Sequence, residues 1–135
     1  MTRATFLERA SAKFIDGTFA LILASIMSPI GPVAGLVYSL IADGILEGRS
    51  LGKLLVGIKV IDRDTLKPCS INKSVLRNIP FGFALLMFIV PVMGMFLFVV
   101  IGLGVIGIEA YFLYTDLEGM RIGDSLADTL VVKKG

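Results

Sequence analysis

The chain alternates between long apolar blocks and short basic segments. Residues 14–48 and 78–120 contain neither Lys nor Arg, and all thirteen basic residues lie before, between or after these two blocks. A helix needs roughly 20 predominantly apolar residues to cross about 30 Å of hydrocarbon. As one helix, the run of 37 residues from Ile79 to Thr115 would be about 55 Å long, too long for one crossing. Each block is therefore predicted to cross twice.

Proline and glycine mark where each block turns. The segment "SPIGP" at 28–32 breaks the first block, and "PVMGM" at 91–95 interrupts the second. The predicted spans are residues 10–28, 33–48, 78–93 and 95–116. Because "PVMGM" contains no polar residue, a kinked or re-entrant segment within 79–115 is the alternative to a second hairpin.

The basic segments set the expected orientation. Lys and Arg accumulate on the cytoplasmic side of membrane proteins, so both termini, the loop at 49–77 and the tail at 117–135 are expected on that side. The first apolar run continues past the small residues Ala20 and Ala24, which favours a retained span over a cleaved signal. Residues 1–135 are therefore expected to form one multi-pass domain in the cytoplasmic (inner) membrane of the cell, with the lipid bilayer as partner.

The central loop and the tail have local patterns of their own. Ser50 precedes apolar residues at 51, 54, 55 and 58, a spacing typical of a short amphipathic helix at the membrane interface. "GIKVID" and "DTLVVKK" have the β-branched, alternating character of strands, and two lone strands on one side could pair. The predicted fold class is an all-α integral membrane protein of four transmembrane helices in two hairpins. Its small cytoplasmic loop and tail subdomain is open to a short β pairing.

Composition supports a membrane protein and removes several other classes. Hydrophobic residues make up 56% of the chain and charged residues 18%, whereas soluble domains carry about 25% charged residues. The net charge of +2 comes without a basic cluster interleaved with aromatic residues, so no nucleic-acid partner is expected. With no His and one Cys, Cys69, the sequence predicts no metal site, no cofactor and no nucleophile–base pair, and therefore no enzyme.

The apolar blocks contain acids but no bases, which makes the acids the functional candidates. An Asp at the centre of a membrane helix costs about 2.5–3.5 kcal/mol, so such residues usually face the bundle interior and find a partner. The candidates for an ion or proton pathway are Asp16, Asp43, Glu109 and Asp116. Glu109 is expected to lie deepest, beside three glycines, where a carboxylate could bind and release a proton or a monovalent cation.

A structural role is the alternative for these charges. Arg9 and Asp16 lie seven residues apart on one helix face, so each needs a partner from another element. Arg9, Asp16, Arg77 and Asp124 are expected to form one polar cluster at the cytoplasmic interface, because each would otherwise be an unpaired charge near hydrocarbon. Such ion pairs would lock the helix ends to the loop and tail.

Small residues at helical spacing favour close contacts between helices, within one chain or between chains. They are Ala20 and Ala24, Gly31 and Gly35, and the group Gly102, Gly104 and Gly107. Since two short hairpins bury little surface alone, a homo-oligomer is expected.

Motifs in four places share a pattern with one family. "RASAKFID" contains Arg9, Ala12 and Asp16, and "SVLRN" supplies Arg77. "GRSLGKLLVGIKVID" contributes a loop motif of Gly48, Ser50, Gly52, Lys53, Gly57 and Val60. "GDSLADTLVV" contributes Asp124, Ala127, Thr129 and Val132. In their order along the chain the motifs resemble those of the RDD family of small bacterial and archaeal membrane proteins, named for one arginine and two aspartates. Asp128 stands where that family usually has glycine.

Two functions are compatible with this resemblance. It implies a membrane protein with a cytoplasmic loop, for a class in which cation/proton exchange has been proposed. The first hypothesis is therefore transport of protons or monovalent cations past the buried acids. The second is a non-catalytic scaffold that presents its loop and tail to a protein partner or to anionic lipid.

Overall fold

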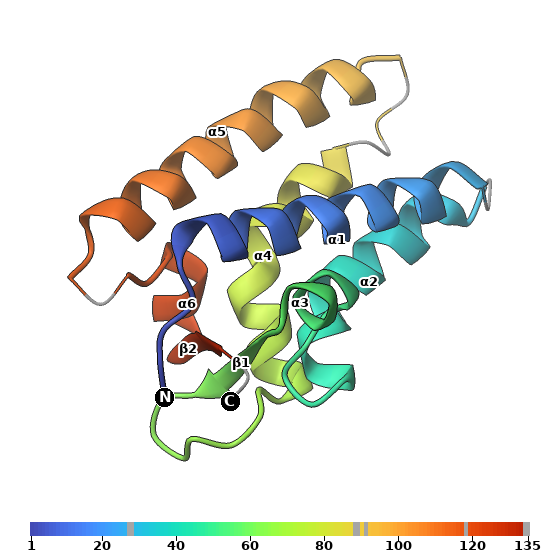
Figure 1. Cartoon of the computed structure of the whole chain (residues 1–135). Coiled ribbons are helices and arrows are strands. Elements are labelled where there is room, and N and C mark those ends of the chain that lie inside the picture. Colours follow the sequence, from blue (N-terminus) through green and yellow to red (C-terminus); the bar gives the residue numbers. More distant parts are fainter. Residues whose placement is uncertain (27–28, 88–89, 91, 118, 134–135) are drawn as a thin grey trace.

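Four long helices and a small subdomain of short helices and strands make up the protein (Figure 1). The structure is a computed structural model that describes residues 1–26, 29–87, 90, 92–117 and 119–133. The elements are α1 (Phe6–Ile26), α2 (Gly31–Ile45), α3 (Leu51–Val56), β1 (Ile58–Asp62), α4 (Ile71–Met87), α5 (Gly94–Thr115), α6 (Ile122–Leu126) and β2 (Thr129–Lys133).

Two helices begin earlier than the apolar pattern predicted, because polar caps extend them. Thr5 and Glu8 form a reciprocal cap before α1, with Thr5 N donating to Glu8 Oε2 over 2.8 Å and Glu8 N donating to Thr5 Oγ1 over 3.3 Å. Ser70 Oγ accepts a hydrogen bond from Lys73 N at the start of α4. The helix therefore begins seven residues before the predicted span at 78–93, and Arg77 lies inside α4.

The predicted breaks fall between helices. α1 ends at Ile26 and α2 begins at Gly31, while α4 ends at Met87 and α5 begins at Gly94. Residues 28 and 91, which belong to the two predicted turns, lie outside the described residues. Figure 1 shows α4 and α5 as two separate helices, with α5 running back toward the end of the molecule where α6 lies.

The predicted β pairing is confirmed. β1 and β2 form an antiparallel sheet in which Val60 stands opposite Val131. The start of the chain lies along the other edge of β2, where Ala4 N donates to Val131 O over 3.0 Å. Ile58, Val60 and Val131 pack with Ala12 of α1 in the core beneath the sheet. These contacts join the N-terminus, the central loop and the tail into one subdomain at one end of the helices (Figure 1).

Small residues bring α1 and α2 together, as their spacing predicted. A Cβ on Gly35 would collide with the carbonyl oxygen of Ala20, and one on Gly31 would collide with that of Ala24. The glycines of α5 behave differently, because a Cβ on Gly102, Gly104 or Gly107 would meet no atom within 4 Å. They do not mediate a close contact within the described part of the chain.

One described helix, α5, is long and apolar enough to cross a membrane by length and composition. α2 is apolar but has only 15 residues. α1 has 21 residues, and it carries Glu8, Arg9, Lys13 and Asp16 in its first half. The fold is thus mostly helical with a two-stranded sheet, and four crossings remain a prediction.

Candidate functional site

Seven charged side chains from all six helical segments form one continuous series of ion pairs where the helices meet the subdomain. We call it the ion-pair chain, and its members are Lys53, Asp43, Arg77, Asp124, Arg9, Arg121 and Glu109. Every member is buried. The chain therefore links the ends of the long helices to α3 and α6.

Asp124 is the centre of this chain. Its carboxylate lies 2.6 Å from Nη2 of Arg77, 3.1 Å from Nη1 of Arg9 and 3.4 Å from Nη2 of Arg121. Burial disfavours its ionised form, but the three guanidinium groups outweigh burial and hold its pKa well below the usual range. Asp124 is thus an anion that fixes α6 against α1 and α4.

A glycine allows this close approach. A Cβ on Gly123 would collide with the carbonyl oxygen of Arg77, so α6 can lie directly on α4 only because residue 123 lacks a side chain. Arg121 precedes α6 and also lies 3.5 Å from Glu109 through its Nε. Burial opposes the charge of Arg121, but Asp124 and Glu109 outweigh it and raise its pKa.

Asp43 is the second acid with two cations. Its carboxylate lies 2.6 Å from Lys53 Nζ and 3.7 Å from Arg77 Nη1, and it also accepts a hydrogen bond from Asn78. Burial lowers the pKa of Lys53 despite the opposing attraction of Asp43. Asp43 connects α2 to α3 and α4, which fits a structural role better than an ion site.

Asp16 does not belong to the predicted cluster with Arg9, Arg77 and Asp124. It accepts hydrogen bonds from the hydroxyl of Tyr38 over 2.9 Å, from Gly52 N over 2.8 Å and from Ser50 Oγ. Placing it with the arginines was wrong, because the amide and hydroxyl at the start of α3 satisfy its carboxylate in place of a cation. Asp16 therefore ties α1 to the loop motif.

Each residue of the loop motif has a definite place in this arrangement. Gly48 has a φ of +82° and its carbonyl accepts from Val60 N, and Gly57 ends α3 with a φ of +80°. Ser50 is the N-cap of α3. A Cβ on Gly52 would collide with the carbonyl oxygen of Ala12, so Gly52 lets α3 pack on α1. Lys53 reaches Asp43.

Glu109 is the acid with the weakest compensation among those of the ion-pair chain. It is 3% exposed, and its Oε1 accepts from Gly123 N over 3.3 Å. Its Oε2 lies 3.5 Å from Arg121 Nε but accepts no hydrogen bond from the described residues. Asp116, the remaining candidate, is half-buried at the end of α5 and lies outside the cavity described next.

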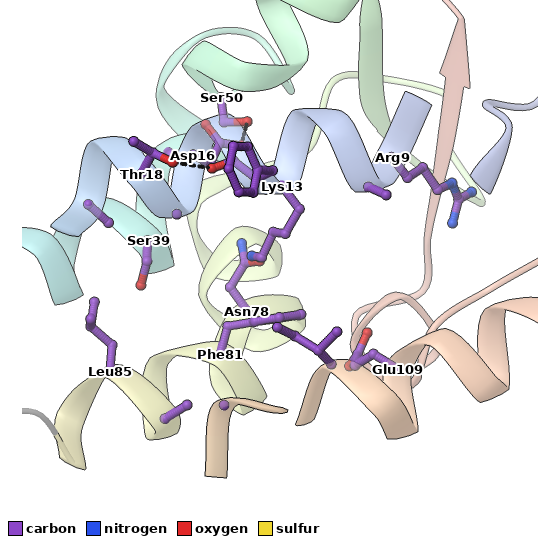
Figure 2. Close-up of a pocket in the computed structure, with 18 of the residues that line it drawn as sticks. Arg9, Lys13, Asp16, Thr18, Ser39, Ser50, Asn78, Phe81, Leu85 and Glu109 are labelled. Atoms are coloured by element: carbon purple, nitrogen blue, oxygen red, sulfur yellow. Dashed lines mark hydrogen bonds between the residues drawn. The ribbon is translucent and has the colours of Figure 1, made fainter. Parts of the chain in front are cut away.

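A cavity of about 450 Å³ lies among α1, α2, α4 and α5 (Figure 2). Its walls are mostly apolar, but both Asp16 and Glu109 line it. Lys13 extends from α1 toward α4, where its Nζ lies 3.2 Å from Asn78 Oδ1 and 3.9 Å from the centre of the Phe81 ring (Figure 2). None of the ion pairs among the described residues includes Lys13.

Lys13 was missed by the sequence analysis, which grouped it with the cytoplasmic basic residues. The available signal was its position, since Arg9, Lys13 and Asp16 are spaced by four and three residues and so share one helix face. Cys69 is buried, and burial raises the pKa of its thiol to about 11, so it stays a thiol at neutral pH. The described residues include no cluster of three or more His, Cys, Asp or Glu placed to hold a metal ion.

The positions that build this site are those of a known family. The model of the RDD family matches residues 3–128, which is nearly the whole chain. The chain belongs to the RDD family. No curated protein and no solved structure matches the chain. Membership supports a small membrane protein. The contacts of Arg9, Asp16 and Asp124 therefore show how one member of the RDD family positions these motif residues.

Proposed function

We propose that this RDD protein transports protons or monovalent cations across the membrane through the cavity between its long helices. The observation that carries the proposal is Glu109, a buried carboxylate whose Oε2 accepts no hydrogen bond from the described residues and which lines the same cavity as Asp16. In a membrane helix, a carboxylate with an incomplete set of partners marks a candidate position on an ion pathway.

The other acids are poorer transport sites. Asp43 and Asp124 each lie against two or more cationic groups, and losing these contacts would leave buried charges unpaired. Asp16 already accepts three hydrogen bonds, so it serves mainly to hold α3. Glu109 is therefore the residue on which transport is expected to depend.

The test is ion flux in liposomes that contain the purified protein. Proton movement is followed with an enclosed pH dye while Na⁺, Li⁺ or K⁺ gradients are imposed. Glu109→Gln keeps the size and the polarity of the side chain but removes its charge, and it is expected to reduce flux at least tenfold. The matched control is Glu47→Gln, because Glu47 lies in the turn after α2 and its side chain is 82% exposed.

A Glu109→Gln variant that folds like wild type and carries full flux would rule out this site. Correct folding is checked by the melting temperature in detergent. It should change little, because Arg121 keeps its ion pair with Asp124 and the Gln oxygen can still accept from Gly123 N. The Glu47→Gln control is expected to transport like wild type.

A scaffold is the second candidate function, and the ion-pair chain favours it. The ion-pair chain fixes α3, α6 and the β1–β2 sheet rigidly to the ends of the long helices. A surface that presents the loop and tail to a partner would require such rigidity. In that case the liposomes carry no flux, and both Glu variants leave partner or lipid binding unchanged. A homo-oligomer is compatible with either function, since the glycines of α5 face open space.

A further inference from the structure

The charges of the residues that line the cavity do not sum to zero, because Lys13 adds one positive charge that no lining acid matches. The other charged residues that line it are three basic and three acidic: Arg9, Lys53, Arg121, Asp16, Asp43 and Glu109. At their ordinary ionisation these six cancel. Lys13 is the seventh, and it adds one positive charge.

The surroundings of Lys13 would also suit the neutral amine. Its partners are the amide oxygen of Asn78 and the face of Phe81, and both can remain in place when the amine loses a proton. The part of α4 that lines the cavity contributes no titratable side chain. α2 contributes the hydroxyl of Tyr38, which donates to Asp16, and the carboxylate of Asp43, which lies 2.6 Å from Lys53 and accepts from Asn78. α5 contributes Glu109, which lies 3.5 Å from Arg121. By contrast, Lys53 and the three arginines of the ion-pair chain each lie against a carboxylate.

We infer that Lys13 and a monovalent metal cation compete to supply the single excess positive charge of this cavity. Either Lys13 is protonated and the cavity holds no metal cation, or Lys13 is neutral and the cation lies near Glu109, whose Oε2 accepts no hydrogen bond from the described residues. A proton and a cation together would leave two excess charges in a low-dielectric space, which is strongly disfavoured.

The exchange balances in protons and charge. On one side of the membrane the ammonium of Lys13 gives its proton to water, and one cation enters. On the other side the cation leaves, and the neutral amine takes one proton from water. Each cycle moves one cation against one proton, so the net charge moved is zero. This inference rests on the proposed transport function and names its stoichiometry and its competing residue.

Proton release by the purified protein tests the inference without any flux measurement. Na⁺, Li⁺ or K⁺ is added to the protein in weakly buffered detergent solution, and the released protons are compared with the bound cations measured by calorimetry. Wild type is expected to release about one proton for each cation bound. Its apparent cation affinity should fall tenfold per pH unit at acidic pH, as expected when one proton competes for the site.

Two variants separate this role from simple packing. Lys13→Gln removes the ammonium but keeps a polar chain, so it should bind the cation with no proton release and with an affinity independent of pH. Lys13→Arg keeps a permanent charge and should bind at least tenfold more weakly. The control is Lys67→Gln, because Lys67 is exposed in the turn after β1.

The outcomes distinguish the two proposals. Proton release that persists unchanged in Lys13→Gln, wild-type affinity that does not depend on pH, or no cation binding by wild type would each overturn the role of Lys13. If Lys13→Gln does not fold, the pH dependence of wild type decides alone. Cation-coupled proton release by a wild type that shows no flux in liposomes would instead overturn transport and leave the competition in place.

Discussion

At the scale of single residues, the carboxylate of Asp16 shows how an acid is accommodated on the buried face of a largely apolar helix. Its two oxygens accept from Tyr38, Gly52 and Ser50, so the cost of burying it is offset by hydrogen bonds from Tyr38 and from the start of α3. Gly52 is essential to this contact, because a side chain there would push α3 away from α1. Asp16 thus holds the central loop against the helices.

Asp16→Asn is expected to destabilise the fold. An amide has one acceptor oxygen in place of two and no charge, so it cannot satisfy all three donors. The free energy of unfolding should fall by about 1–3 kcal/mol, measured by thermal or denaturant unfolding in detergent. Tyr38→Phe removes one donor and leaves the carboxylate in place, so it should cost less. Equal stability of Asp16→Asn and wild type would show that Asp16 is not an anchor.

Asp128→Gly is expected to stabilise the protein. Asp128 has a φ of +50°, in the left-handed region where a side chain is disfavoured and glycine is not. Its ion pair with Arg63 is 4.0 Å long and exposed, so its loss costs little. The gain should be up to about 1 kcal/mol in unfolding free energy. Asp128→Ala keeps the strained backbone and should give no gain, and a Gly variant that melts below wild type would contradict this explanation.

At the scale of elements, α6 is held mainly by charge. It has five residues, too few to be stable alone, and it carries the acid on which three guanidinium groups converge. Removing one member of a buried ion pair typically costs about 3–5 kcal/mol. Asp124→Asn should therefore lower the free energy of unfolding by a similar amount at neutral pH, whereas Asp64→Asn, in the exposed turn after β1, should have little effect.

The same contact predicts a dependence on acid. Because the pKa of Asp124 is lowered in the folded state, its contribution to stability is complete above the unfolded pKa of about 4 and is lost as the pH falls further. Wild type should lose stability below pH 4 more steeply than Asp124→Asn, which has no such group. Parallel curves for the two proteins in that range would contradict the assignment.

Much of the element order could be predicted from sequence, because periodicity and breaks are local signals. The caps that begin α1 and α4 lie outside the apolar runs, which is why Arg77 was assigned to the loop. Partners of the charges depend on contacts distant in sequence, such as Asp124 with Arg9. Lys13 and its partner Asn78 lie 65 residues apart, so no local pattern could reveal their contact.

At the scale of the whole molecule, the subdomain and the long helices form one linked structure. The N-terminus, central loop and tail meet at the β1–β2 sheet, so they must lie on the same side of any membrane that the helices cross. From the positive-inside rule we expect that side to be the cytoplasmic one. The ion-pair chain lies at this end of the helices, where charged side chains can pair with one another outside the hydrocarbon.

Labelling of single cysteines tests this topology. In a Cys69→Ser background, cysteines at positions 3, 63 and 133 should react only with reagents that reach the cytoplasm. A cysteine at position 30, which is 65% exposed in the turn before α2, should react from the opposite side. Position 133 reacting from the opposite side would rule out two complete hairpins.

Transport through the cavity is the central claim, and wild-type protein in liposomes tests it most directly. An inward gradient of Na⁺, Li⁺ or K⁺ is imposed while the membrane voltage is clamped at zero, and the pH inside the vesicles is recorded. The proposed cation/proton exchange predicts that at least one of the three gradients drives protons out and raises the internal pH, whereas protein-free liposomes do not respond. Internal pH that stays flat for all three cations would contradict transport and leave the scaffold as the function of this chain.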